Sequence, residues 1–243
     1  MTIAILGTLD TKGHEHAYVA ELIRTRGHST LLIDAGTGAA PQVQPDITRD
    51  EVAAASGMDL QSLIARQDRG ESVTAMSRAA AALVSQLHEQ GRIHGIISLG
   101  GGGGTAIGSA AMRVLPVGFP KLMVSTLAAG NVAPYVGTKD IAMFPSIVDV
   151  SGLNRISRAV LGNGAHAMAA MARSWIEQNA SAPGRRAAAD RPLVGMTMFG
   201  VTTPCVQQVV KLIEQDWEPL VFHATGIGGR SMEKLIESGL MQG

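Results

Sequence analysis

The 243-residue sequence has few aromatic residues and no excess of charge of either sign. Phe, Trp and Tyr make up 3% of the chain, and 20 basic residues balance 20 acidic ones. Neither a basic groove for nucleic-acid phosphates nor an aromatic platform for stacked bases is indicated. We therefore do not expect nucleic acid as a partner.

Cysteine and long apolar runs are also scarce. The single cysteine, Cys205, cannot form an intramolecular disulfide, and the opening residues MTIAILG lack the basic region and cleavage site of a signal peptide. Gly, Pro or charged residues interrupt every apolar run well before the roughly 20 residues needed to cross a bilayer. A cytoplasmic protein without membrane contact is expected.

Glycine, by contrast, is abundant. Five consecutive glycines at 100–104 join the apolar stretch 96–99 to a run of small residues that begins at Thr105. Successive glycines leave backbone N–H groups accessible, and a helix N-terminus carries partial positive charge, so the pattern favours a phosphate-binding loop. A flexible linker is the alternative, but linkers are normally flanked by Ser, Pro or charged residues.

Apolar runs alternate with amphipathic segments along the chain. Strands are predicted at 2–6, 29–33, 94–99, 121–126 and 141–144. Helices between them require right-handed crossovers and hence a parallel sheet. The predicted fold class is α/β, a doubly wound parallel sheet of the Rossmann-like kind. A long helix is predicted at 154–178, broken at Gly162-Asn163-Gly164.

Composition divides the chain into two predicted lobes. Residues 1–180 form the nucleotide-binding lobe, 181–192 have the Ala, Arg and Pro content of a linker, and 193–243 begin a second α/β lobe. Two predicted strands at 193–198 and 219–223 cannot complete a parallel sheet. The second lobe is therefore expected to be truncated, in a chain that is a fragment of a longer protein.

The loops after the first and third strands should diverge at the switch point of the sheet and form a crevice. Lys12 is expected to meet a phosphate there, and Asp10 to hold Mg²⁺; alternatively Asp10 caps the helix and Lys12 is solvated. Asp34 either accepts hydrogen bonds from a ribose or forms a turn. The predicted nucleotide-binding residues are Gly7, Thr8, Asp10, Thr11, Lys12, Asp34, Gly101, Gly102, Gly103, Gly104, Thr105, Ser125, Thr126, Gly130 and Asn131.

Two further motifs have simpler interpretations. His14-Glu15-His16 has the residue types of a metal site, but a spacing of two on a helix points the imidazoles apart, so a solvated first turn is predicted. Cys205 follows Thr202-Thr203-Pro204 at a helix start, where a nucleophile is conceivable. A buried structural cysteine is the preferred interpretation.

The chain resembles the ATP-binding domain family typified by the tomato mosaic virus resistance protein of plants. The resemblance runs through the segments ILGTLDTKG at 5–13, LGGGGGT at 99–105, ST at 125–126, GTKDI at 137–141 and MTMFGVTT at 196–203. It implies two Rossmann-like lobes, ATP and magnesium bound in the first, and a homodimer.

The crevice without an evident catalytic pair favours a regulatory or interaction module that binds Mg-ATP. The alternative is an enzyme of phosphoryl or nucleotidyl transfer, with a second substrate between the lobes. A sensor of a small anionic metabolite is a third possibility. Whether the protein is an enzyme stays open at this point.

Overall fold

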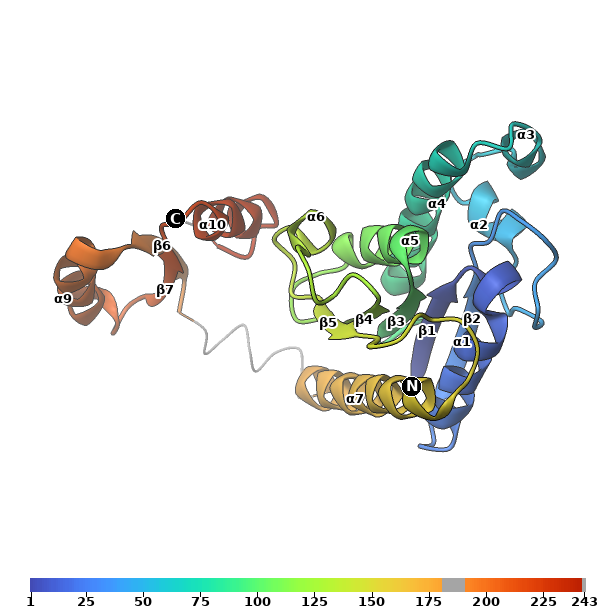
Figure 1. Cartoon of the computed structure of the whole chain (residues 1–243). Helices are drawn as coiled ribbons and strands as arrows, with labels where there is room; N and C mark the ends of the chain where they lie inside the picture. The colour runs from blue at the N-terminus through green and yellow to red at the C-terminus, as the bar shows by residue number, and fades with distance from the viewer. Residues whose placement is uncertain (181–190, 242–243) are drawn as a thin grey trace. The chain divides into compact units, whose positions relative to one another are not determined.

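The structure of the chain is a computed structural model that describes residues 1–180 and 191–241 (Figure 1). The chain separates into two compact units, Met1–Gln178 and Asn179–Gly243. Of the predicted linker, residues 181–190 lie outside the described residues. Each unit is described below by itself.

The first unit is built on a five-stranded sheet in the order β2-β1-β3-β4-β5. Every neighbouring pair is parallel. The predicted α/β fold class is therefore confirmed, and β1 and β3 lie side by side as the switch-point argument required. The strands are β1 (Thr2–Gly7), β2 (Ser29–Asp34), β3 (Ile96–Gly100), β4 (Lys121–Ser125) and β5 (Ala142–Pro145).

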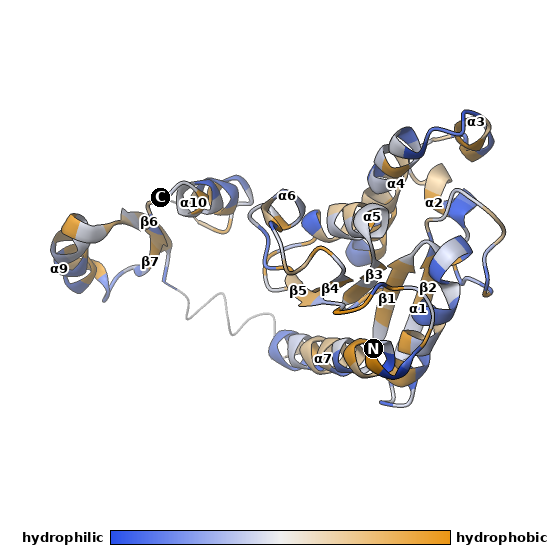
Figure 2. Cartoon of the chain, viewed as in Figure 1, coloured by the Kyte–Doolittle hydropathy of each residue, from blue (hydrophilic) through white to orange (hydrophobic). Residues whose placement is uncertain are grey.

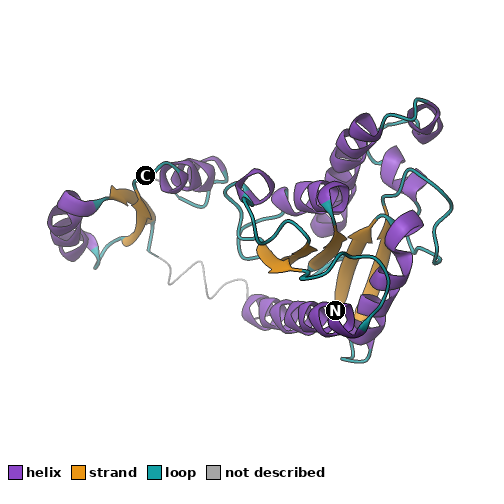
Figure 3. Ribbon diagram, viewed as in Figure 1, coloured by secondary structure: helices purple, strands orange, loops and turns teal. Residues whose placement is uncertain are grey.

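Helices cover both faces of this sheet (Figures 1 and 3). α1 (Leu9–Arg24) and α7 (Arg155–Ala180) lie on one face, and α4 (Arg69–Glu89) and α5 (Gly102–Arg113) lie on the other. Three short helices complete the unit: α2 (Arg49–Ala54), α3 (Leu60–Ala65) and α6 (Ala133–Val136). None of the helices in the described part of the chain is long and apolar enough to span a membrane.

The strands divide their side chains between two cores. In β1, Ala4 and Leu6 pack with α4 and α5, whereas Ile3 and Ile5 pack with α1 and α7. All four are fully buried. This is the apolar pattern expected of a parallel strand covered on both faces, and Figure 2 shows the central strands as largely hydrophobic.

The long helix α7 is not broken at Gly162-Asn163-Gly164, so that prediction was wrong. A Cβ on Gly164 would lie 3.0 Å from Val124 Cγ2 on β4. The glycine therefore lets the helix approach the sheet closely. Glycine inside a helix costs about 1 kcal/mol relative to alanine, and close packing against the sheet offsets that cost.

An ion pair between a buried lysine and an exposed aspartate fixes the start of β4. The Lys121 side chain is fully buried, and its Nζ donates to the carbonyl oxygens of Pro116 and Phe119, both at 2.7 Å. Nζ also lies 2.8 Å from Asp140 Oδ1, while Asp140 Oδ2 accepts a hydrogen bond from Gly118 N. The three protons of the ammonium group thus all have acceptors, and the turn before β4 is held in place.

The second unit contains the two strands that were predicted. β6 (Leu193–Met198) and β7 (Glu218–His223) pair in parallel, with η1 (Gly200–Thr202), α9 (Thr203–Ile213) and α10 (Ile227–Glu237) beside them. Cys205 is exposed, so its prediction as a buried cysteine was wrong. The partly covered residues of α9 are Thr203, Val206, Val210 and Ile213, and Cys205 lies off this stripe.

Candidate functional site

A cleft of about 490 Å³ lies at the carboxyl end of the sheet, where β1 and β3 meet. The chain leaves β1 for α1 on one face and leaves β3 for α5 on the other, so the two connecting loops diverge. This is the switch point at which open parallel sheets bind ligands. The cleft is lined by Thr8, Asp10, Thr11, Lys12, Ala35, Thr37, Gly38, Arg69, Ser72, Val73, Gly101, Gly102, Gly103, Gly104, Ile107 and Asp149.

Residues 101–104, which follow β3 and include the first turn of α5 (called the β3–α5 loop), contribute backbone to the cleft. Gly101 is the N-cap residue of α5, and no side chain caps this helix end. The first N–H groups of a helix have no intrahelical acceptor and carry its positive partial charge. A Cβ on Gly102 would meet no atom within 4 Å, so the space in front of this residue is open. An anion can therefore approach these amides directly.

Thr8 and the first turn of α1 (residues 8–12, called the β1–α1 loop) contribute side chains, and Asp34 fixes this segment. Asp34 is 1% exposed, and its Oδ1 accepts hydrogen bonds from Leu9 N at 3.0 Å and Gly36 N at 2.9 Å. Thr8 Oγ1 and Thr11 Oγ1 lie 3.0 Å apart at the cleft surface. Asp34 thus forms the turn, the second of the two roles that the sequence left open.

Asp10 and Asp34 place two carboxylates around Gly36. Asp10 Oδ2 accepts a hydrogen bond from Gly38 N at 2.7 Å, and Asp10 Cγ lies 2.7 Å from the position that a Cβ on Gly36 would take. Asp10 Oδ1 and Asp34 Oδ2 are both buried without a hydrogen-bond partner. Burial raises the pKa of Asp34, and the negative charge of Asp10 adds to this effect. A cation would stabilise both carboxylates.

Two cationic side chains also line the cleft. Lys12 Nζ donates to the Val150 carbonyl, and Lys12 itself has non-helical dihedral angles (φ −136°, ψ 27°) that kink α1. The Arg69 side chain makes no hydrogen bond or ion pair with any described residue. Arg69 was not predicted from the sequence. The only local signal is the cap of α4, where Asp68 Oδ1 accepts from Glu71 N at 2.9 Å.

Several predicted residues lie outside the cleft lining. Gly7 is buried, and a Cβ there would lie 1.9 Å from His16 Nε2, so this glycine makes room for the imidazole. Thr105 and Ser125 are fully buried and joined by a 2.6 Å hydrogen bond between their hydroxyls. Thr126 lines a neighbouring cavity, and Gly130 and Asn131 lie on the exposed loop before α6, where Asn131 Oδ1 accepts from Ala133 N.

The prediction that His14-Glu15-His16 is a solvated turn was wrong for two of its residues. Glu15 and His16 are buried, because the kink at Lys12 turns this part of α1 toward the sheet. Glu15 Oε1 accepts from Gly152 N, and His16 Nδ1 donates to Lys12 O at 2.6 Å. Burial lowers the pKa of His16 below its usual value. No group of three or more potential metal ligands occurs among the described His, Cys, Asp and Glu residues.

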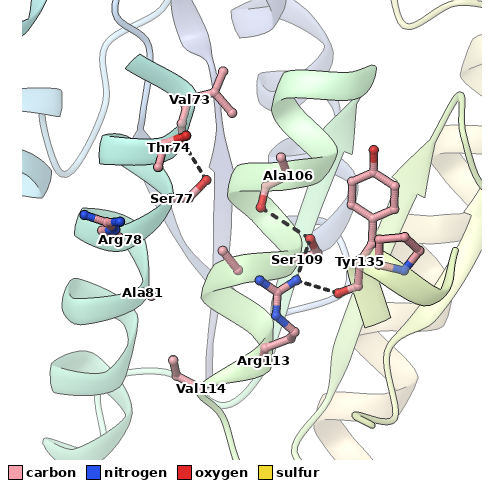
Figure 4. Close-up of a pocket in the computed structure, with 12 residues that line it drawn as sticks. Val73, Thr74, Ser77, Arg78, Ala81, Ala106, Ser109, Arg113, Val114 and Tyr135 are labelled. Atoms are coloured by element: carbon pink, nitrogen blue, oxygen red, sulfur yellow. Dashed lines mark hydrogen bonds between the residues drawn. The ribbon is translucent and has the colours of Figure 1, made fainter. Parts of the chain in front are cut away.

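A second groove, of about 500 Å³, lies between α4, α5 and α6 (Figure 4). Arg113 Nη1 joins α5 to α6 by donating to Tyr135 O at 2.7 Å, and it also donates to Ser109 Oγ within α5 at 3.4 Å. Val73 is the one residue that it shares with the cleft. None of the residues predicted to bind nucleotide lines this groove.

Comparison with solved structures gives weak matches of low sequence identity. UDP-GlcNAc 2-epimerase from Neisseria meningitidis, bound to UDP-GlcNAc, aligns with a TM-score of 0.34 at 9% identity, over 98% of this chain and 70% of that one. The UDP-GlcNAc 2-epimerase from Methanocaldococcus jannaschii, in complex with UDP-GlcNAc and UDP, also aligns with a TM-score of 0.34. The sequence identity is 10%, and the alignment covers 99% of this chain and 69% of that one.

Sequence comparison gives much stronger matches. A UPF0261 protein of Clostridium tetani is 47% identical over 99% of this chain and 58% of its own length. A UPF0261 protein of Rhizobium meliloti is 46% identical over 99% of this chain and 57% of its own length. The ToMV resistance protein Tm-1(GCR237) of Solanum lycopersicum is 44% identical over 72% of this chain and 23% of its own. The chain thus spans little more than half the length of its bacterial relatives.

Models of two family domains match the sequence. The N-terminal domain of the uncharacterised protein family UPF0261 matches residues 1–177, and its C-terminal domain matches residues 191–243. The family resemblance seen in the sequence is confirmed in this respect, since the same relatives include the tomato ToMV resistance protein. The chain belongs to the UPF0261 family.

Proposed function

We propose that the cleft between the β1–α1 and β3–α5 loops binds ATP with Mg²⁺, and that the protein acts as a dimeric regulatory or interaction module. The observation that carries this proposal is the meeting of the open glycine loop with Asp10 and Lys12 in one cleft, from segments about ninety residues apart in the sequence. Bare amides, cations and a carboxylate with a free oxygen are together the groups that a Mg-triphosphate needs.

The phosphates would be bound by the glycine loop and by the two cations. The uncapped N-terminus of α5 offers amides and positive potential, and Gly102 leaves room for close approach. Lys12 and Arg69 add charge from the other side of the cleft. The Lys12 ammonium has three protons and uses one on Val150 O, so it can bind a phosphate oxygen at the same time.

Magnesium fits the unpartnered carboxylate oxygen. Asp10 Oδ1 is buried without a hydrogen-bond partner, and so is Asp34 Oδ2. Mg²⁺ is commonly held by one or two carboxylates together with phosphate oxygens and water. Asp10 is therefore the residue that would hold the ion, and the ion would neutralise charge between the carboxylates and the triphosphate.

Calorimetric titration tests this proposal. The protein should bind ATP with an affinity that rises when Mg²⁺ is added, and it should bind adenosine far more weakly, because the phosphates carry most of the interaction. Equal affinities for ATP and adenosine, or no binding of either, would contradict it. Saturable binding of a sugar phosphate in place of ATP would indicate a metabolite sensor.

A phosphate-release assay on the ATP-bound protein separates a binding module from an enzyme. We expect no turnover beyond slow hydrolysis. Steady release faster than about 1 per second would instead identify an enzyme of phosphoryl transfer.

A further inference from the structure

A third cavity, of about 510 Å³, lies at the carboxyl ends of β4 and β5. It is lined by Thr126, Ala129, Pro145, Ser146, Ile147, Val148 and Asp149. The proposed phosphate contacts use none of these residues. Its position beside the cleft raises the question of what part of a ligand it could hold.

The cavity adjoins the phosphate cleft. Asp149 lines both. Thr126 N donates to Gly100 O at 3.2 Å, and Thr126 Oγ1 lies 3.6 Å from the position that a Cβ on Gly101 would take. A ligand whose phosphates contact the glycine loop can therefore extend into this cavity past Asp149.

The lining of the cavity is mainly apolar, and Ile147 is an exposed member of it. Ile147 has a φ of 65°, a backbone conformation that β-branched residues rarely adopt, and it is 75% exposed. The turn is held from both sides, since Ser146 N donates to Ser125 O at 3.0 Å and Ser146 Oγ donates to Val148 O at 2.6 Å. Strained residues maintained in this way are concentrated at ligand sites.

Asp149 stands at the border between the apolar cavity and the phosphate cleft. In a nucleotide the ribose lies between base and phosphates, and a carboxylate there can accept hydrogen bonds from its hydroxyls. Asp34, the sequence candidate for this role, is buried and already binds two backbone N–H groups. Asp149 is exposed, and its side chain makes no hydrogen bond with any described residue.

We infer that this cavity binds the nucleoside part of the ligand, with the base against Ile147, Pro145 and Ala129 and the ribose hydroxyls on Asp149. The inference rests on the proposed function, because it takes the phosphates to lie at the glycine loop. It assigns selectivity for ribonucleotides to a residue that sequence reasoning did not single out.

The test compares ATP with inorganic triphosphate, which has no nucleoside. In calorimetry with Mg²⁺, Asp149→Ala should weaken ATP binding roughly tenfold to a hundredfold, the usual range for a hydrogen bond to a charged group, and leave triphosphate binding unchanged. Ile147→Asn suits the left-handed backbone and removes the apolar contact. It should weaken ATP binding roughly tenfold and leave triphosphate binding unchanged.

Matched controls and a variant-free measurement complete the design. Asp50→Ala and Val117→Asn change similar side chains outside both cavities and should alter neither the affinity for ATP nor that for triphosphate.

A second experiment uses the wild-type protein and therefore does not depend on the folding of a variant. This protein should bind 2′,3′-dideoxy-ATP roughly tenfold more weakly than ATP. Triphosphate binding with no selective loss for ATP in either variant, or equal binding of ATP and dideoxy-ATP, would overturn the nucleoside assignment alone. Failure to bind either ATP or triphosphate would overturn the proposed function as well.

Discussion

The two loops that form the cleft are built in opposite ways. In the β1–α1 loop the side chains are engaged: Asp10 with Gly38 N, and Lys12 with Val150 O. In the β3–α5 loop side chains are missing, and Gly102 faces open space. One loop is shaped by the contacts that its side chains make, and the other by the absence of a Cβ.

This difference predicts how each loop responds to change. Adding a side chain to the glycine loop should block the ligand and spare the fold. Removing a side chain from the β1–α1 loop should remove a single contact with the ligand, such as the one with the metal ion or with one phosphate. Experiments on the two loops therefore give separable results if the cleft binds a Mg-nucleotide.

The largest effect is expected for Gly102→Val. The Cβ of the new side chain meets no protein atom within 4 Å, and the side chain occupies the space before the α5 amides, so ATP affinity should fall on the order of a hundredfold, about 2.7 kcal/mol. Calorimetry measures the affinity, and thermal unfolding without ligand should match that of the control Gly229→Val, a glycine in the first turn of α10 that also has open space around it. Unaltered ATP affinity would place the phosphates elsewhere.

Asp10→Asn tests the contribution of Mg²⁺ to ATP affinity. The amide oxygen can still accept from Gly38 N, but the neutral side chain is a poor ligand for Mg²⁺. We expect the increase in ATP affinity caused by Mg²⁺ to be lost, roughly tenfold, while affinity measured in EDTA changes little. If magnesium strengthened ATP binding equally in both proteins, Asp10 would not be the metal ligand.

Lys12→Ala tests a single phosphate contact. Loss of the ammonium should weaken ATP about fivefold to tenfold and leave adenosine affinity unchanged. Lys12→Arg keeps the charge and should recover part of the affinity, which separates the charge from the contact with Val150. An equal loss for ATP and adenosine would show that Lys12 lies away from the phosphates.

The last prediction concerns pH and the buried His16 of α1. Burial lowers the pKa of His16 in the folded protein, whereas the unfolded chain takes up a proton below about pH 6.5. The free energy of unfolding should therefore fall as the pH decreases from 6.5, by up to about 1.4 kcal/mol per pH unit from this group. Urea unfolding of His16→Gln should show a shallower decline.

Gly102→Val provides the control for this experiment, because the glycine loop carries no titratable side chain. Its decline with pH should match that of the wild type. A His16→Gln profile as steep as the wild-type profile would show that other groups dominate the acid sensitivity.

The sheet could be read from the sequence because its central apolar runs, which form β1, β3 and β4, are strands buried on both faces. The third strand was predicted at 94–99 and lies at Ile96–Gly100. The pairing of the first and third strands also followed, since the loops after them had to form the crevice. The glycine run and residues 8–12 accordingly meet in the cleft.

Side-chain direction could not be read in the same way. Asp34 and Ser125 end their strands as expected, yet both turn inward to bind backbone or a neighbouring hydroxyl. Gly7 is needed because a Cβ there would collide with the imidazole of His16, nine residues later in the kinked helix α1. Arg69 and Asp149 reach the cleft from distant segments, and no local pattern marks them.

Chemical modification of the buried Lys121 can report local opening of the protein at the start of β4. The Lys121 side chain is fully buried and its ammonium group is held by two carbonyls and the Asp140 carboxylate, so an acylating reagent in solution reaches it only when this segment opens. Mass spectrometry of timed acetylation would then record modification at this position at the rate of local opening.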